Sequence, residues 1–167
     1  MSETEGSVAA GKGEPLTVEA FATLTGGSGR LLGLDVGTKT IGLALSDLSR
    51  MIASGLVTIR RTKFKEDARQ LLALVEQHGV KGLVVGMPFN LDGSAGPRVQ
   101  APRAFMRTLA ALTALPLLAW DERLTTAAAE RLLIEADASR RRRSEVIDKV
   151  AATLILQGAL DRMRLAK

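Results

Sequence analysis

Residues 31–47 read LLGLDVGTKTIGLALSD, two apolar runs of strand-like composition on either side of a short turn at 37–40. This pattern predicts a β-hairpin. One carboxylate, Asp35, lies within the first run, and the alternation of side chains along a strand places it on the same face as Gly33. Because burying an unpaired carboxylate is costly, two explanations are open: Asp35 binds a metal ion, for which Gly33 leaves room, or it only caps the turn.

The composition predicts one globular domain preceded by a tail. The chain has 167 residues, 46% of them hydrophobic, which is enough for a sizeable core. Residues 1–30 are rich in Gly, Ser, Thr and Glu, so we expect a mostly disordered extension there and the folded domain over 31–167. The segment LTVEAFATL (16–24) could form a short helix on a partner, but disorder is the simpler expectation.

Charge is distributed unevenly along the chain. The net charge is +5, and residues 1–30 contain two basic and four acidic side chains, so residues 31–167 carry +7. A compact basic domain favours a polyanionic partner, most often nucleic acid, although a merely basic soluble protein fits the same numbers.

The residue inventory excludes several classes of site. Cys is absent, which excludes a disulfide framework and a thiolate zinc site, and a single His poorly supplies an imidazole metal site or a Ser-His-Asp triad. No apolar run approaches the roughly 18 residues of a membrane helix, and the acidic N-terminus lacks the apolar core of a secretory signal. We therefore expect a cytoplasmic protein without a membrane partner.

Beyond the hairpin, hydrophobic periodicity predicts strands that alternate with helices. Residues 82–88, GLVVGMP, form an uninterrupted apolar run that is typical of a strand buried on both faces of a parallel sheet. Together with the hairpin, this run predicts an α/β fold with a mixed sheet and helical cover. The other expected elements are strands over 51–61 and 115–122, a loop over 89–97, and helices over 66–78, 102–114, 127–136 and 144–163, the last with Ser144 as its N-cap.

Three acids stand out because each lies in an apolar element or at its end: Asp35, Glu122 and Asp148. If the strands of Asp35 and Glu122 run parallel, their C-terminal ends share one edge of the sheet, and the last helix could bring Asp148 there as it packs. Carboxylates this close repel one another until a proton or a multivalent cation relieves the repulsion. A cluster with oxygen ligands alone suits Mg²⁺ or Mn²⁺, and two such ions can promote phosphodiester cleavage.

Each acid also has a plain structural explanation. An acid in the first turn of a helix is favourable whatever the function, which covers Asp148. Glu122 could be a solvated strand end, and Asp121, on the other face of the strand, competes with it for a place in the site.

Further side chains could contact the phosphates of a nucleic acid, or could equally be solvated surface. The loop residues Asp92, Gly93 and Ser94 could clamp a strand through backbone N–H groups, or simply form a turn. Trp120 could stack on a base, although a lone Trp at a strand end usually belongs to the core. The basic candidates are Lys39, Arg123, Arg140, Arg141, Arg142, Arg143 and Lys149.

Four stretches, in this order, resemble the YqgF/RuvX family of RNase H-like proteins: LGLDVGTKTIGLALSD, VVGMPFNLDGSAGP, DERLTT and IDKVAATLILQGAL. The resemblance covers 31–162 and implies an RNase H-like mixed five-stranded sheet flanked by helices. It implies metal-binding catalytic roles for Asp35, Glu122 and Asp148, and a nuclease that matures the 5′ end of 16S rRNA; the family was earlier proposed to resolve Holliday junctions. The chain departs from the family pattern in its long N-terminal extension and at Pro102, where an uninterrupted helix is usual.

From the residues and the resemblance together we expect a divalent-metal-dependent endonuclease, with Mg²⁺ or Mn²⁺, acting on structured RNA. Its expected partners are precursor rRNA and pre-ribosomal particles, and its working form is a monomer or a homodimer. Two alternatives stay open: a Holliday junction resolvase acting on DNA, and a non-catalytic nucleic-acid-binding module. A sugar- or acetate-kinase-like phosphotransferase, which DVGTKT also resembles, is discounted because roughly 135 residues are too few for the two domains it needs.

Overall fold

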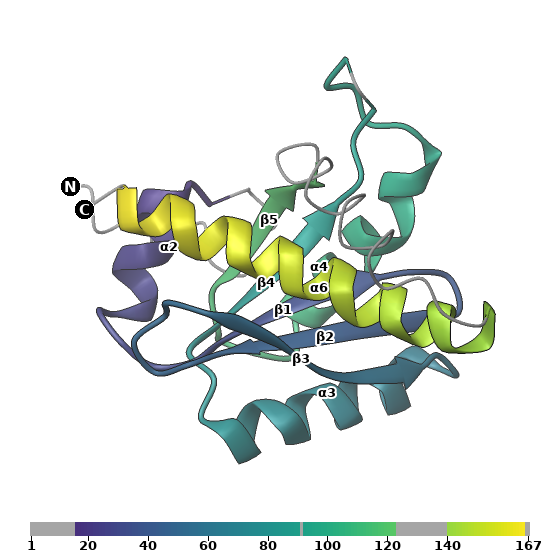
Figure 1. Cartoon of the computed structure of the whole chain (residues 1–167), viewed down its shortest axis with the longest axis horizontal. Coiled ribbons are helices and arrows are strands. Elements are labelled where there is room, and N and C mark those ends of the chain that lie inside the picture. Colours follow the sequence, from purple (N-terminus) through teal and green to yellow (C-terminus); the bar gives the residue numbers. More distant parts are fainter. Residues whose placement is uncertain (1–15, 91, 123–139, 166–167) are drawn as a thin grey trace.

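The computed structural model describes residues 16–90, 92–122 and 140–165, with side chains throughout except at 140–148. Its centre is a five-stranded sheet of order β3-β2-β1-β4-β5 (Figure 1). β1, β2 and β3 pair antiparallel, while β4 and β5 run parallel to β1, as predicted for a mixed sheet. The strands are β1 Leu31–Val36, β2 Thr40–Ser46, β3 Ala53–Arg60, β4 Gly82–Met87 and β5 Leu117–Asp121.

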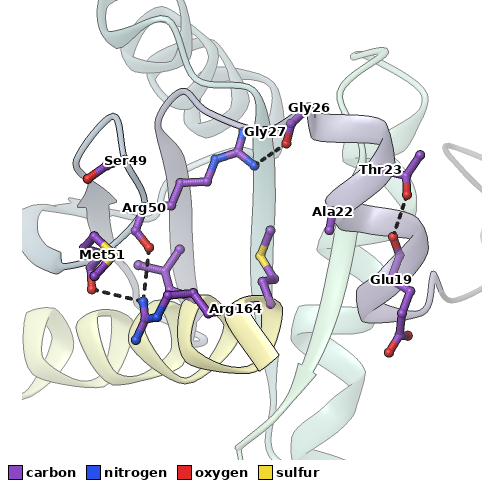
Figure 2. A pocket seen from close by; sticks show the side chains of 11 residues that line it. Glu19, Ala22, Thr23, Gly26, Gly27, Ser49, Arg50, Met51 and Arg164 are labelled. Atoms are coloured by element: carbon purple, nitrogen blue, oxygen red, sulfur yellow. Dashed lines mark hydrogen bonds between the residues drawn. The ribbon is translucent and has the colours of Figure 1, made fainter. Parts of the chain in front are cut away.

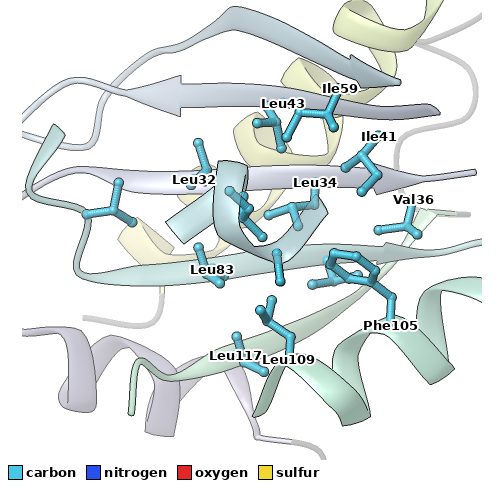
Figure 3. Packing of buried hydrophobic residues seen from close by; sticks show 14 of the residues in the cluster. Leu32, Leu34, Val36, Ile41, Leu43, Ile59, Leu83, Phe105, Leu109 and Leu117 are labelled. Carbon is cyan, nitrogen blue, oxygen red and sulfur yellow. The ribbon is translucent and has the colours of Figure 1, made fainter. Parts of the chain in front are cut away.

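Helices cover both faces of this sheet. α6 crosses one face and α3 lies on the other (Figure 1). Alternation along β1 explains the two layers: Leu32 and Leu34 enter an apolar cluster with α3 and α4 (Figure 3), whereas Leu31 enters a second cluster with α6 and α2. Within the described ranges no helix is both long and apolar enough to cross a membrane. The helices are α2 Val18–Thr25, α3 Phe64–His78, the 3₁₀ helix η1 Pro97–Val99, α4 Gln100–Ala110 and α6 Arg140–Leu165.

Small residues on one face of the sheet let α6 come close to it. Gly33 of β1 pairs with Ala44 of β2. A Cβ at Gly33 would lie 2.7 Å from Cβ of Leu156 and 3.0 Å from the carbonyl oxygen of Ala152. The space at Gly33, which the sequence suggested for a metal ion beside Asp35, is therefore filled by the helix.

We expect Gly33→Ala to lower the free energy of unfolding by about 1–3 kcal/mol, because the added methyl group overlaps α6 and the helix must shift. Chemical denaturation of the purified variant measures this loss. Gly27→Ala is the matched control, since a Cβ at Gly27 meets no atom within 4 Å. Equal unfolding free energies for the two variants would show that the helix and the sheet are not packed this tightly.

Part of the expected disordered extension is folded. Thr17 caps α2 by accepting a hydrogen bond from the backbone N–H of Ala20. Phe21 is fully buried and Leu16 nearly so, in the same apolar cluster as α6. The prediction of disorder was wrong for residues 16–30, because this short helix depends on tertiary packing that its own sequence pattern does not reveal. Residues 1–15 lie outside the described part of the chain.

A buried arginine, Arg50, fixes the end of α2. Its Nη atoms donate to the backbone carbonyl oxygens of Thr25, Gly26 and Ser28 at 2.7–2.8 Å, and its Nε donates to that of Gly29 at 2.7 Å. These carbonyls follow the C-terminal end of the helix, where a positive charge is favourable. Arg50 thereby joins the first helix to the turn between β2 and β3.

The helices α3, α4 and α6 all begin earlier than predicted, and α4 also ends four residues earlier. α4 begins at Gln100, so Pro102 lies in its first turn. The helix tolerates a proline there because the backbone N–H groups of the first turn have no acceptor within the helix. α6 begins at Arg140, so the predicted N-cap at Ser144 was wrong and the four consecutive arginines belong to the helix. The helix predicted over 127–136 lies outside the described residues.

Candidate active site

Two of the predicted acids come together at the C-terminal edge of the parallel strands. Asp35 is the fifth residue of β1, and Glu122 directly follows β5, with β4 between them. Gly86 of β4 allows this approach, because a Cβ there would lie 2.7 Å from Oε2 of Glu122 and 2.3 Å from Cδ1 of Ile155. The Glu122 side chain thus lies over Gly86, next to β1, on the face of the sheet that α6 covers.

The electrostatics of Glu122 show that the two acids interact. Burial is the main cause that raises the pKa of Glu122 from 4.5 to about 7, and the negative charge of Asp35 is the second. Arg98 lowers this pKa and Asp121 raises it, both more weakly. Asp121 pairs with Met87, which belongs to the apolar cluster on the other face of the sheet, so Glu122 is the acid that shares a face with Asp35. A half-buried carboxylate pair of this kind is stabilised by a proton or by a cation.

We expect the metal-free protein to lose stability as the pH rises from about 4.5 to about 7. The pKa of Glu122 is about 7 in the folded chain, against the ordinary value of 4.5 that applies once the chain unfolds, so within this window the folded protein keeps a proton that the unfolded chain has lost. Thermal unfolding in EDTA across this range measures the effect. Glu122→Gln should remove the difference; a variant whose melting temperature follows pH in the same way as the wild type would contradict this assignment.

The third predicted acid, Asp148, belongs to α6 and precedes Ala152 by four residues, about one helical turn. Ala152 contacts the sheet at Gly33, so the backbone register places residue 148 on the sheet-facing side of the helix. The side chain of Asp148 lies outside the described residues. Among the side chains that are described, no three His, Cys, Asp or Glu residues form a group that could hold a metal ion, and the described part of the site is the Asp35–Glu122 pair.

The predicted phosphate-binding residues are only partly described. Lys39 is exposed in the turn between β1 and β2. Lys149 is exposed on α6, with its Cβ 3.2 Å from where a Cβ of Gly55 in β3 would lie. Arg123 and the side chains of Arg140–Arg143 lie outside the described residues.

The loop after β4 has its own internal hydrogen bonds. The Ser94 backbone N–H and hydroxyl both donate to Oδ1 of Asp92, at 2.9 and 2.7 Å, and the Gly93 N–H donates to the carbonyl oxygen of Asn90 at 2.9 Å. The N–H groups of Gly93 and Ser94, two of the three loop residues predicted to clamp a strand, are therefore already engaged, and a clamp through them would require these bonds to open.

Sequence reasoning missed one charged residue of the site, Arg98. It lies in η1 and acts electrostatically on Glu122, 24 residues further along the chain. The available signal was a basic residue directly after Pro97, between the predicted loop over 89–97 and the predicted helix over 102–114. Trp120 is 5% exposed and packs in the cluster with α6, which confirms the core interpretation over base stacking.

A pocket of about 480 Å³ lies away from the acids, between α2, the turn between β2 and β3, and the C-terminal part of α6 (Figure 2). Arg164 crosses one side of it and donates to the carbonyl oxygens of Arg50 and Met51 at 3.3 and 3.5 Å. Of the described residues that line it, none is a predicted site residue. This pocket lies where α2 packs against α6 and the turn between β2 and β3.

Comparison with known sequences relates most of the chain to one family. Residues 29–162 match the family model of RuvX, described as Holliday junction resolvase. A protein of Paracoccus denitrificans is 59% identical over 147 residues, which is 88% of this chain and 93% of that protein. A Beijerinckia indica protein is 61% identical over 140 residues, 84% of this chain and 85% of that protein. Both carry the provisional name of pre-16S rRNA nuclease.

Solved structures show the same fold at low sequence identity. Thermus thermophilus RuvC, in complex with its Holliday junction substrate, superposes with a TM-score of 0.55 at 16% identity, covering 81% of this chain and 96% of that one. The yeast mitochondrial Holliday junction resolvase Ydc2 gives a TM-score of 0.53 at 11% identity, covering 98% and 94%. These likenesses confirm the predicted RNase H-like architecture.

Proposed function

This chain belongs to the RuvX family, and from that membership and the geometry of its acids we propose a metal-dependent endonuclease that hydrolyses phosphodiester bonds in structured RNA and matures the 5′ end of pre-16S rRNA. The observation that carries the proposal is the pairing of Asp35 with Glu122 over Gly86. Acids whose pKa is strongly shifted cluster at functional sites, because holding two carboxylates close together costs stability and serves a purpose mainly where the charges are used. The name of the relatives supports RNA as the substrate.

The donor set of the acid pair fits Mg²⁺ or Mn²⁺. Asp35 and Glu122 offer oxygen ligands alone, which these hard ions prefer, and their mutual repulsion is relieved by positive charge. We propose that Asp35, Glu122 and Asp148 hold the metal, which when bound activates water and offsets the charge of the phosphate. Glu122, with its pKa of about 7, must release its proton to serve as a ligand, so metal affinity falls with falling pH.

The basic character of the domain supports a polyanionic substrate. Residues 31–167 carry a net charge of +7 against −2 for residues 1–30, from a total of +5. Lys39 and Lys149, both exposed, are proposed to contact phosphates, as are Arg123 and Arg140–Arg143. Such contacts add affinity and salt dependence without reading sequence.

A second candidate is a resolvase that cuts four-way DNA junctions as a homodimer. The description of the family as Holliday junction resolvase and the shared fold with RuvC favour it. The test uses one purified protein and two substrates, a pre-16S RNA with its 5′ extension and a four-way DNA junction, each with Mg²⁺, with Mn²⁺ and with EDTA.

We expect metal-dependent cuts in the RNA, no cuts in EDTA and little cutting of the junction. Paired symmetrical nicks in the junction, with intact RNA, would support the resolvase instead. Binding without cutting of either substrate under all metal conditions would leave a non-catalytic nucleic-acid-binding module.

We further propose that the protein works in the cytoplasm on pre-ribosomal particles. Sequencing the 5′ ends of 16S rRNA in cells depleted of the protein tests this role. Extended 5′ ends are the expected result, and normal ends throughout would count against rRNA maturation.

A further inference from the structure

Arg98 is held at the edge of the sheet where both acids lie. It sits in η1, which leads directly into α4, between Pro97 and Val99. Val99 is 1% exposed and packs in the same cluster as Val36 and Met87, the last residues of β1 and β4. Pro97 restricts the backbone on the other side. The position of Arg98 is thus set by a buried anchor and a rigid neighbour.

The hydrogen-bond donors of Arg98 remain available. The side chain is exposed, and within the described part of the chain no hydrogen bond or salt bridge engages its guanidinium. Arg61 offers a contrast, because its Nη1 donates to the Gly37 carbonyl oxygen at 2.7 Å and its Nε lies 3.8 Å from a carboxylate oxygen of Asp67. Arg98 acts on Glu122 through its charge, lowering the pKa of that acid, without being tied to it.

We infer that Arg98 binds the phosphate that is cut, donating from its guanidinium to the non-bridging oxygens beside Asp35 and Glu122. This inference rests on the proposed nuclease function and adds a residue to it. The planar guanidinium matches two phosphate oxygens at once. Val99 anchors the backbone beside Arg98, so binding has to order only the side chain of Arg98.

The chemistry of hydrolysis makes such a cation useful. The water oxygen forms a bond to phosphorus, the P–O bond to the leaving oxygen breaks, and one proton of the water ends on that leaving oxygen. Negative charge spreads over the non-bridging oxygens as this happens. A guanidinium positioned beside the phosphate stabilises that charge.

A structural role for Arg98 predicts a different outcome. If Arg98 only holds Glu122 in position, its removal should weaken metal binding together with cleavage. If it binds the phosphate, its removal takes a positive charge away from a cation site, so metal affinity, measured at a pH well above the pKa of Glu122, should stay the same or increase.

Arg98→Ala and Arg98→Lys are compared with Arg107→Ala. Arg107 is an exposed arginine in the last turn of α4, nine residues and about 13 Å further along the helix. The readouts are single-turnover cleavage of pre-16S RNA and Mn²⁺ affinity measured by calorimetry without RNA. Arg98→Ala should slow cleavage roughly 10- to 100-fold, and Arg98→Lys should recover part of the loss. Arg107→Ala should stay within about twofold of the wild type.

Two results would overturn the inference: equal cleavage by Arg98→Ala and Arg107→Ala, or a loss of cleavage by Arg98→Ala that follows weakened Mn²⁺ binding. A binding assay separates this failure from failure of the proposed function. In the Asp35→Asn background, RNA affinity is measured with and without Arg98→Ala. Weaker RNA binding by the double variant supports the phosphate contact even if the wild-type protein cuts no RNA. Equal RNA binding, together with cleavage by the wild-type protein, overturns the role of Arg98 and leaves the proposed function standing.

Discussion

Asp35→Asn is expected to reduce metal-dependent cleavage of pre-16S RNA on the order of 1,000-fold. Asparagine keeps the size of the side chain but removes the negative charge that would hold the cation. The same change removes one cause of the raised pKa of Glu122, so the folded protein should be no less stable than the wild type. Single-turnover rates at saturating Mg²⁺ measure the loss, and Glu122→Gln and Asp148→Asn should behave alike.

Asp161→Asn is the control for these three variants. Asp161 lies on α6 with its side chain 51% exposed, and it pairs with Arg164 at the end of the helix away from the acids. An exposed pair contributes little, so Asp161→Asn should cut at close to the wild-type rate. If the three acid variants cut as fast as this control, the assignment of the acids is wrong.

Gly86→Ala is expected to slow cleavage about 100-fold without changing any charge in the site. The added methyl group would stand 2.7 Å from Oε2 of Glu122, so the carboxylate must move away from its place over β4. A displacement of about 1 Å in a catalytic group can lower the rate by this much. Single-turnover cleavage and Mn²⁺ affinity measure the effect.

A double variant separates the two contacts of this methyl group. It would also stand 2.3 Å from Cδ1 and 2.9 Å from Cγ1 of Ile155, two atoms that Ile155→Ala removes. Gly86→Ala/Ile155→Ala therefore relieves the contact with α6 but keeps the overlap with Glu122. The rate should stay low in the double variant; recovery to the wild-type rate would trace the loss to the helix instead of the acid.

The sheet and the acid pair could be predicted because each depends on a local pattern. The apolar runs around 37–40 and at 82–88 specify their strands by composition, and parallel pairing brings the C-terminal ends of β1 and β5 to one edge. The alternation of side chains along β5 puts Asp121 and Glu122 on opposite faces of the sheet, and the sequence does not show which of them shares a face with Asp35. The packing of α6 on one face of the sheet decides between them.

The features that were missed depend on contacts between distant residues. α2 is stabilised by the burial of Phe21 in the main fold and by Arg50, which follows Thr25 by 25 residues. Nothing within the helix shows either contact. Arg98 likewise reaches the site because Val99 is anchored in the core, which no periodicity reveals. The side chain of Asp148, the third proposed ligand, stays a prediction.

Arg50 has a consequence for where this protein can be shortened. The family match starts at residue 29, beyond α2. A chain trimmed to that point would leave the guanidinium of Arg50 facing an empty space where the carbonyl groups of 25, 26 and 28 had been, beside the hollow left by Phe21. The stretch that the family model matches and the stretch needed for a complete interior thus begin at different residues, one helix apart.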